Sequence, residues 1–263
     1  MKSCNDVMMH MAADLGATRF AKYVRSFGFG SKTGIDLPGE AEGGIFSKEK
    51  LHQVELATSS FGQGQTVTMI QLASAFSAVI NGGNYYQPHV VKEINSESGA
   101  VVSSNDNTLV KRVVSEDASK LIRKYLEKTV EDDEGTANPA RVKGYVIGGK
   151  TGTAEKWPRN EGKYLVSFAG FTPTDKPELM IYVVIDEPHV SDQAHSTYAT
   201  EFASEVLKDV LPMLGIYKQT GKSDSAKKIT LPSTKKGNQL LEVPKGGFSS
   251  STYKVAKSKK NNG

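Results

Sequence analysis

The chain has 263 residues, of which 38% are hydrophobic, with a mean hydropathy of −0.39 and a formal net charge of +4 at pH 7. This length is sufficient for one domain with a substantial core, and no apolar run approaches the roughly 20 residues that a membrane-spanning helix needs. The single cysteine, Cys4, excludes an internal disulfide, and the first residues show no signal-peptide pattern.

The charge is distributed unevenly along the chain. Residues 218–263 contain eleven lysines against two acidic residues, whereas residues 1–217 contain 22 basic and 27 acidic residues. We therefore expect a mildly acidic domain over 1–217 and a basic, disordered tail over 218–263. The tail's charge alternatively indicates attraction to an anionic wall polymer or membrane surface. Because aromatic residues are nearly absent from the tail, we do not expect nucleic acid as a partner.

Apolar residues at helical spacing predict two helices in the first 27 residues. Asn5 is the expected N-cap of the first helix, which continues to Leu15, and the second contains Phe20, Val24 and Phe27. Residues 31–50, with several glycines and a proline, are predicted to form an exposed loop.

A glycine-rich loop precedes the next predicted helix. Thr66 or Thr68 is expected to start this helix, and the residues from Asn81 to Gly83 are expected to end it. Its predicted buried stripe consists of Met69, Ala73, Phe76 and Ile80. The loop residues Gln63 and Gly64 are candidate substrate-binding residues, because backbone at a helix N-terminus can meet a polar ligand or an anion. A plain connection would show the same pattern.

The second half of the sequence alternates between strand and helix signals. A hairpin is predicted over residues 89–103, and Ser115 is the expected cap of a helix over 116–131 with an apolar side of Leu121, Ile122, Tyr125, Leu126 and Val130. Strands are expected around Lys150, over 164–171 and over 179–185, followed by a helix over 200–214. Three consecutive strands with short connections predict an antiparallel meander. The fold class is therefore α+β, an antiparallel sheet with helices on its faces.

The segment from Gly144 to Glu155 combines one lysine, two hydroxyls and several glycines, and it allows two interpretations. Gly144 and Gly149-Lys150-Thr151 match the phosphate-binding loop G-x-x-x-x-G-K-[ST] of a P-loop NTPase, which requires a helix that begins at the lysine. Gly152 and the nearby proline disfavour such a helix. Alternatively, Lys150-Thr151-Gly152 is the K-T-G motif of serine acyl-transferases, placed on a strand. A solvated hairpin would also account for the segment.

Several segments in order resemble one family, the transpeptidase domain of class B penicillin-binding proteins. They are Ser3-Cys4-Asn5, the segment around Gln63 and Gly64 with the helix that follows, residues 135–140, residues 149–156, residues 167–173 and residues 184–188. The resemblance covers about residues 3–216. It implies a β-lactamase/transpeptidase-like fold and acyl transfer from D-Ala-D-Ala stem peptides to an amine, which cross-links peptidoglycan.

The resemblance also implies a role for each motif residue. Ser3 would relay a proton toward the leaving amine, and Asn5 would hold an amide oxygen of the substrate. Lys150 would supply positive potential for the stem-peptide carboxylate. Thr151 and Thr153 would bind that carboxylate, and the Thr153 amide would form half of an oxyanion hole beside the open space at Gly152. The peptide would add to this strand edge.

The sequence departs from the family at the nucleophile. In the family an S-x-x-K motif precedes S-x-N, and here only two residues precede Ser3. The S-x-x-K matches after Ser3 stand in the wrong order; one of them, at Ser251, would require a circular permutation. We therefore expect the chain to be inactive by itself and to be the C-terminal part of a longer transpeptidase, incomplete at its N-terminus. Apolar surface on the helices within 7–27 and 66–80 should then be uncovered.

The family implies partners and a location for the full-length protein. The partners are peptidoglycan stem peptides, β-lactams, and a membrane-embedded glycan polymerase or division proteins; the location is the extracytoplasmic face of a bacterial membrane. We expect no cofactor, and the five histidines form no spaced metal-binding cluster. The alternative function is that of a non-catalytic pseudoenzyme that binds wall peptides or a partner protein.

Overall fold

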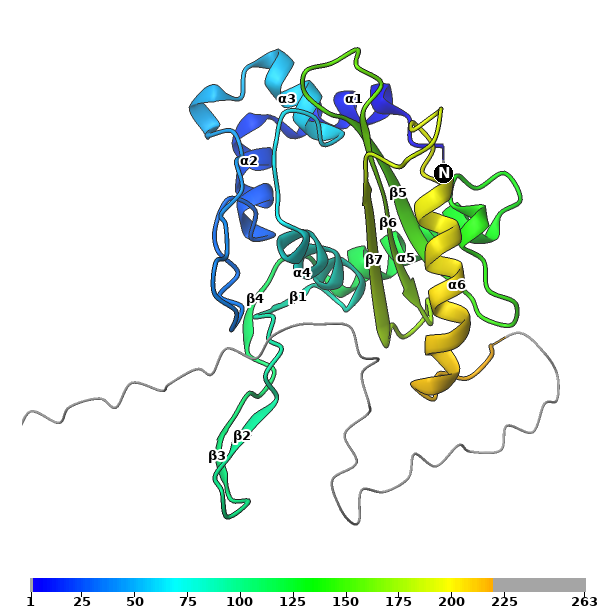
Figure 1. The fold of residues 1–263 in the computed structure, drawn as a ribbon. Helices are drawn as coiled ribbons and strands as arrows, with labels where there is room; N and C mark the ends of the chain where they lie inside the picture. The colour runs from blue at the N-terminus through cyan, green and yellow to red at the C-terminus, as the bar shows by residue number, and fades with distance from the viewer. Residues whose placement is uncertain (1, 220–263) are drawn as a thin grey trace, which may run out of the picture. The chain divides into compact units, whose positions relative to one another are not determined.

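The structure is a computed structural model, and it describes residues 2–219. The predicted α+β organisation is confirmed within this range (Figure 1). The helices are α1 (Asn5–Leu15), α2 (Ala17–Ser26), α3 (Gln53–Ser60), α4 (Met69–Ile80), α5 (Glu116–Glu131) and α6 (Thr197–Met213), with short 3-10 helices at Lys48–Lys50 and Asn138–Ala140. The strands are β1 (Asn84–Tyr86), β2 (Glu93–Asn95), β3 (Val101–Ser104), β4 (Leu109–Arg112), β5 (Gly148–Glu155), β6 (Tyr164–Thr172) and β7 (Leu179–Asp186).

The main sheet is the predicted antiparallel meander, in the order β5-β6-β7. Lys150 is opposite Ala169, and Ala169 is opposite Tyr182 on the third strand. In the described part of the chain β5 pairs with β6 on one side only, so its other side is an edge of the sheet. Two smaller antiparallel pairs, β1 with β4 and β2 with β3, lie outside this sheet.

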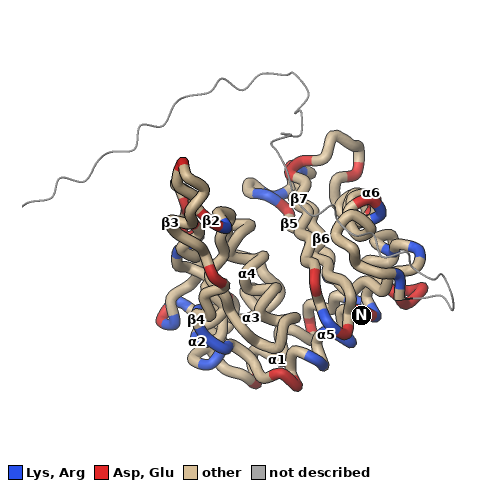
Figure 2. The backbone as a smooth tube through the Cα atoms, turned by 90° about the horizontal axis from the view of Figure 1, so that it is seen from below, with Lys and Arg blue, Asp and Glu red and all other residues tan. Residues whose placement is uncertain are grey.

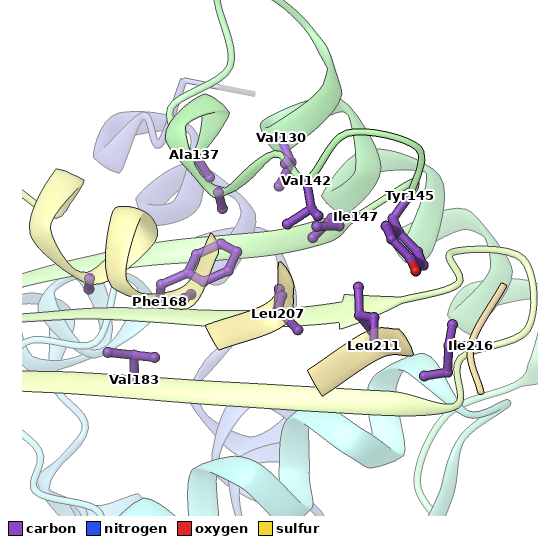
Figure 3. Packing of buried hydrophobic residues seen from close by; sticks show 13 residues of the cluster. Val130, Ala137, Val142, Tyr145, Ile147, Phe168, Val183, Leu207, Leu211 and Ile216 are labelled. Carbon is purple, nitrogen blue, oxygen red and sulfur yellow. The ribbon is translucent and has the colours of Figure 1, made fainter. Parts of the chain in front are cut away.

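The two faces of the main sheet pack against different helices. On one face Phe168 lies in a core cluster with Ile147 from the segment before β5 and with Leu207 and Leu211 from α6 (Figure 3). On the other face Phe171 packs with Ile80 of α4 and Leu126 of α5. Side chains alternate between the two faces along a strand. The even-numbered residues of β5 therefore lie on the face of Phe171, and the odd-numbered residues lie on the face of Phe168.

Local chemistry explains where the two central helices begin. The Thr68 hydroxyl accepts from the Gln71 N–H, while the Gln71 side chain accepts from the Thr68 N–H, so the two form a capping box at the start of α4. The Ser115 hydroxyl accepts from the Ala118 N–H at the start of α5. Asn5 is not a cap: Cys4 occupies the N-cap position of α1 without a side-chain hydrogen bond, and Asn5 is the first helical residue.

The predicted buried stripe of α4 is partly wrong, and the predicted apolar side of α5 is only partly buried. On α4, Ile80 is buried but Met69 is 53% exposed. On α5, Leu126 and Val130 are buried, whereas the other three residues of the apolar side are exposed: Leu121, Ile122 and Tyr125. The expected uncovered apolar surface is present on α1, where Val7, Met8 and Met11 are exposed. Helical spacing predicts that an apolar face exists, but neighbouring elements decide how much of it is covered.

The hairpin predicted over 89–103 is present as β2 and β3, and all of its strand residues are exposed. Its base is fixed by Asp36, whose carboxylate accepts from the Val90 and Val91 N–H groups at 2.8 Å each. In Figure 1 the hairpin projects away from the helices and the main sheet. Figure 2 shows that α4 carries no charged residue, in agreement with its sequence.

The predicted domain boundary at residue 217 falls within the described part of the chain. Gln219 donates from its backbone N–H to the Gly144 oxygen at 2.7 Å and accepts the Val146 N–H on its side chain at 3.0 Å. The body therefore reaches Gln219, and the predicted tail from residue 220 on lies outside the described residues. Among residues 2–219, no helix is both long and apolar enough to cross a membrane.

Candidate functional site

Lys150, Thr151, Gly152 and Thr153 lie in the middle of strand β5, as the K-T-G interpretation predicts. No helix begins at Lys150, so the backbone amides that would bind phosphate in a P-loop are not arranged for that task. The P-loop interpretation of this segment is therefore wrong.

Lys150 and Gly152 share the sheet face that packs toward α4 and α5. A methyl group added at Gly148, on the same face, would come within 2.6 Å of the Phe171 ring. At Gly152 an added Cβ would lie 2.6 Å from the Ser167 hydroxyl. Any larger residue at Gly152 would therefore displace Ser167, and the glycine keeps the surface beside Lys150 open.

The free edge of β5 is divided into a covered part and an open part. The Gly149 oxygen accepts from the Thr129 hydroxyl of α5, and the Ile147 N–H donates to the Glu131 carboxylate at 2.9 Å. Both groups point away from β6, and backbone groups of every second strand residue point to the same side. The N–H and C=O groups of Thr151 and Thr153 therefore point to the edge, where no other strand among residues 2–219 pairs with them and only the Lys150 ammonium contacts the Thr151 oxygen. Helix α5 closes the edge up to Gly149 and leaves it open from Thr151 onward.

Thr129 and Glu131 are site residues that the sequence did not reveal. Thr129 is completely buried, and its hydroxyl contacts the Leu126 oxygen of its own helix as well as the Gly149 oxygen. Glu127 of the same helix accepts from the Thr174 hydroxyl in the β6–β7 connection at 2.5 Å. No local motif marks these residues, because their partners are 16 to 47 positions away in the chain.

Lys150 is a half-buried cation without an acidic partner among residues 2–219. Its ammonium group donates to the Thr151 oxygen at 2.7 Å. Burial disfavours the charged form and lowers the pKa of Lys150 below its ordinary value of 10.5. A ligand carboxylate at this position would provide the negative charge that the described protein groups do not.

Ser3 and Asn5 lie at the start of α1, separate from β5 in the hydrogen-bond network. Ser3 is exposed with a φ of 51°, and within residues 2–219 neither side chain is hydrogen-bonded to the K-T-G strand. The adjacent Lys2 binds the Glu134 oxygen at 2.9 Å, just after α5. This contact ties the start of the chain to the helix that packs on β5. That Ser3 and Asn5 face Lys150 across a groove stays a prediction.

Gln63 and Gly64 occupy the turn after α3, whose helix packs against α1. Gly64 has a φ of 82°, a conformation that favours glycine, and an added Cβ would lie 3.2 Å from the Phe46 ring. The Gln63 N–H donates to the Thr58 oxygen. The turn therefore has a structural explanation, and its substrate-binding role also stays a prediction. Within the described residues, no group of three or more His, Cys, Asp or Glu side chains is placed to hold a metal ion.

Comparison with known proteins gives consistent matches. The family model of the penicillin binding protein transpeptidase domain matches residues 1–208. Stage V sporulation protein D of Bacillus subtilis is 42% identical over 248 residues, which are 92% of this chain and 37% of that protein. Penicillin-binding protein PbpB of Mycolicibacterium smegmatis is 30% identical over 197 residues, 71% of this chain and 30% of that protein. The chain thus spans about a third of the length of these relatives.

A solved structure shares the fold. Penicillin binding protein 3 from Mycobacterium tuberculosis, complexed with ampicillin, is 27% identical with a TM-score of 0.75, and the match covers 82% of this chain and 50% of that one. The likeness confirms the predicted β-lactamase/transpeptidase-like fold class.

Proposed function

Because this chain belongs to the penicillin-binding protein transpeptidase family, we propose that it is a D,D-transpeptidase module for peptidoglycan cross-linking that binds D-Ala-D-Ala stem peptides on β5. The proposal rests on the open edge of β5 at Thr151 and Thr153, next to a half-buried lysine without an acidic partner among the described residues. An extended peptide can pair with such an edge as an additional strand.

The geometry gives the motif residues distinct tasks in this proposal. The Lys150 ammonium and the Thr151 hydroxyl attract the terminal carboxylate of the stem peptide. The Thr153 N–H, which points to the open edge, supports the oxyanion that forms when the peptide carbonyl is attacked. Ser3 relays a proton to the departing amine and Asn5 holds an amide oxygen of the peptide, while Gln63 and Gly64 border the bound substrate.

The covalent step needs a nucleophile that attacks the carbonyl carbon. In the family this is the serine of an S-x-x-K motif that precedes S-x-N, and in this sequence only Met1 and Lys2 precede Ser3. We therefore propose that the 263-residue chain by itself binds stem peptides without forming an acyl-enzyme. For the complete transpeptidase we propose β-lactams as ligands, a membrane-embedded glycan polymerase or division proteins as partners, and action on the extracytoplasmic side of a bacterial membrane.

Two measurements test this function. In NMR spectra of the protein labelled with the heavy nitrogen isotope, acetyl-D-Ala-D-Ala should shift the Thr151 and Thr153 amide signals. Acetyl-L-Ala-L-Ala should leave these signals in place. Equal responses to both peptides would contradict stereospecific binding. A fluorescent penicillin should not label the chain covalently. A labelled band that disappears in Ser251→Ala would show that a serine outside the described residues is the nucleophile. It would refute the proposal that the chain forms no acyl-enzyme.

A second candidate is a non-catalytic pseudoenzyme that binds wall peptides or a partner protein, because the open edge of β5 can bind a peptide without a nucleophile. The two candidates differ in what a nucleophile would restore. A chain extended at its N-terminus by the S-x-x-K segment of a relative should gain penicillin labelling if its remaining site is catalytic. It should stay unlabelled, while still binding the peptide, if the site serves binding alone.

A further inference from the structure

Trp157 is the most exposed of the large apolar side chains in the described part of the chain, with 85% of its surface accessible. It is also the sole tryptophan of the protein. It stands in the loop that connects β5 to β6, two residues after Glu155 ends the K-T-G strand. A tryptophan exposed to this extent contributes little to the core, and tryptophan is one of the residue types enriched at contact surfaces.

The loop is held in place by contacts that do not involve Trp157. The Lys156 ammonium contacts Asp186 at 2.9 Å and Glu187 at 2.6 Å, both at the end of β7. The Glu155 carboxylate accepts from the Asn160 N–H at 2.7 Å across the loop, and the Lys156 N–H donates to the Lys163 oxygen at 2.9 Å. These contacts shape the loop while the indole remains uncovered. In Figure 1 the loop stands above the upper end of the main sheet.

The edge of β5 allows an extended ligand to continue in one direction only. At Gly149 the edge is closed by Thr129 of α5. Beyond Thr153 the strand continues through Glu155 toward Trp157, and no strand within the described residues 2–219 pairs with it on that side. A peptide that binds at Lys150 through its carboxylate must therefore direct its preceding residues toward the loop.

The distance along the strand sets how many ligand residues are needed. Four positions separate Thr153 from Trp157 in the sequence, and at about 3.3 Å per residue this corresponds to roughly 13 Å of extended chain. A D-Ala-D-Ala dipeptide placed between Lys150 and Thr153 ends before it reaches the indole. A stem pentapeptide has three further residues, whose extended length of about 10 Å reaches the level of Lys156 at the start of the loop and leaves about 3 Å for the Trp157 side chain to span.

We infer that Trp157 is a second contact point for the wall peptide, and that it covers the stem residues that precede D-Ala-D-Ala. This inference rests on the proposed function, because it assumes that the terminal carboxylate binds at Lys150. The indole provides a rigid apolar surface for the peptide backbone and the methylene groups of the side chains. Recognition of the complete stem thus occurs at two places, K-T-G for the reacting end and Trp157 for the upstream residues.

The experiment uses the full 263-residue chain and two peptides, acetyl-D-Ala-D-Ala and the synthetic stem pentapeptide L-Ala-γ-D-Glu-L-Lys-D-Ala-D-Ala. Because Trp157 is the sole tryptophan, both its fluorescence and its indole N–H signal report on this site alone. Both peptides should shift the Thr151 and Thr153 amides, and the pentapeptide alone should change the indole signals. Trp157→Ala should weaken pentapeptide binding about three- to tenfold and leave dipeptide binding unchanged. Trp157→Phe should recover most of the loss.

The control variant is Tyr23→Ala, which removes an exposed aromatic ring from α2 and should affect neither peptide. If the amides of β5 shift but the indole does not, and Trp157→Ala binds the pentapeptide normally, the inference is overturned and the proposed function stands. If neither peptide shifts Thr151 and Thr153, the proposed function fails for this chain and the inference fails with it. A change in the indole signals without a shift of the Thr153 amide would mean that the peptide contacts Trp157 without binding along β5. This result would also overturn the inference.

Discussion

Replacing Thr129 by valine removes the hydroxyl that joins α5 to the K-T-G strand. Thr129 is fully buried, and its hydroxyl donates toward the oxygens of Leu126 and Gly149. Leu126 is inside α5, so its oxygen keeps a helical backbone partner. The Gly149 oxygen points away from β6 and loses its partner. Valine has nearly the same shape as threonine, so the cost is mainly that of one unsatisfied buried acceptor, about 1–3 kcal/mol.

The variant should also change the strand locally, one residue before Lys150. We expect the amide signals of Lys150 and Thr151 to shift and their hydrogen exchange to become faster than in the parent chain. Urea unfolding followed by far-ultraviolet circular dichroism measures the global loss. Far-ultraviolet circular dichroism is preferable to fluorescence, because the exposed Trp157 reports poorly on the core.

Ser119→Ala provides a matched control on the same helix. The Ser119 hydroxyl is also fully buried, and it accepts from the Gly82 N–H at 3.0 Å and from the Arg123 guanidinium at 3.2 Å, both away from β5. A similar global loss is expected, but without the changes at Lys150 and Thr151. If Thr129→Val unfolds at the parent urea concentration, or if both variants disturb β5 equally, α5 does not position the K-T-G strand as argued.

Two further predictions concern titratable groups. Burial lowers the pKa of Lys150, so between that lowered pKa and 10.5 the unfolded chain binds more protons than the folded chain, and the free energy of unfolding rises with pH in this window. Lys150→Met should remove this rise, as measured by urea unfolding of both proteins from pH 7 to 10; parallel curves would show that the lysine is not buried in solution. Hydrogen bonds from the Val91 and Val90 N–H groups lower the pKa of Asp36. The contribution of Asp36 to the free energy of unfolding is therefore complete above the ordinary pKa of 3.8 and is lost as the pH falls through the lowered pKa. Asp36→Asn should therefore speed hydrogen exchange at the Val90 and Val91 amides and leave the Val113 amide, which donates to Gly83, unchanged; equal protection in both proteins would contradict this account of the hairpin base.

The sequence predicted best what local chemistry decides. Ser115 and Thr68, one of the two predicted starts beside Thr66, cap their helices because a hydroxyl at the N-cap binds backbone N–H groups within three residues. The order of β5, β6 and β7 followed from short connections between consecutive apolar segments. The position of Lys150 on a strand also followed from its neighbours, since Gly152 disfavours the helix that a P-loop requires.

The sequence failed where distant segments decide the outcome. Strands β1 and β4 pair through only three residue pairs, whose members are about 25 positions apart in the sequence. Strands this short show too few alternating residues for their pairing to be predicted from the sequence. Leu121 and Tyr125 belong to the apolar side of α5 by spacing, yet they are exposed because no described element covers that part of the helix. Asn5 is a good N-cap residue type, but the helix begins one residue earlier than a cap at Asn5 requires.

Contacts between distant segments also determine the direction in which a peptide can run along the edge of β5. The K-T-G motif alone specifies a strand with a cation and two hydroxyls, and it is compatible with a ligand that runs either way along the edge. Helix α5 removes this ambiguity, since Thr129 closes the edge at Gly149 and leaves Thr151 and Thr153 open. The start of the free edge is thus fixed by a residue 21 positions before Lys150, and its far end is marked by the exposed Trp157. A substitution in α5 can therefore alter peptide binding without touching the motif itself.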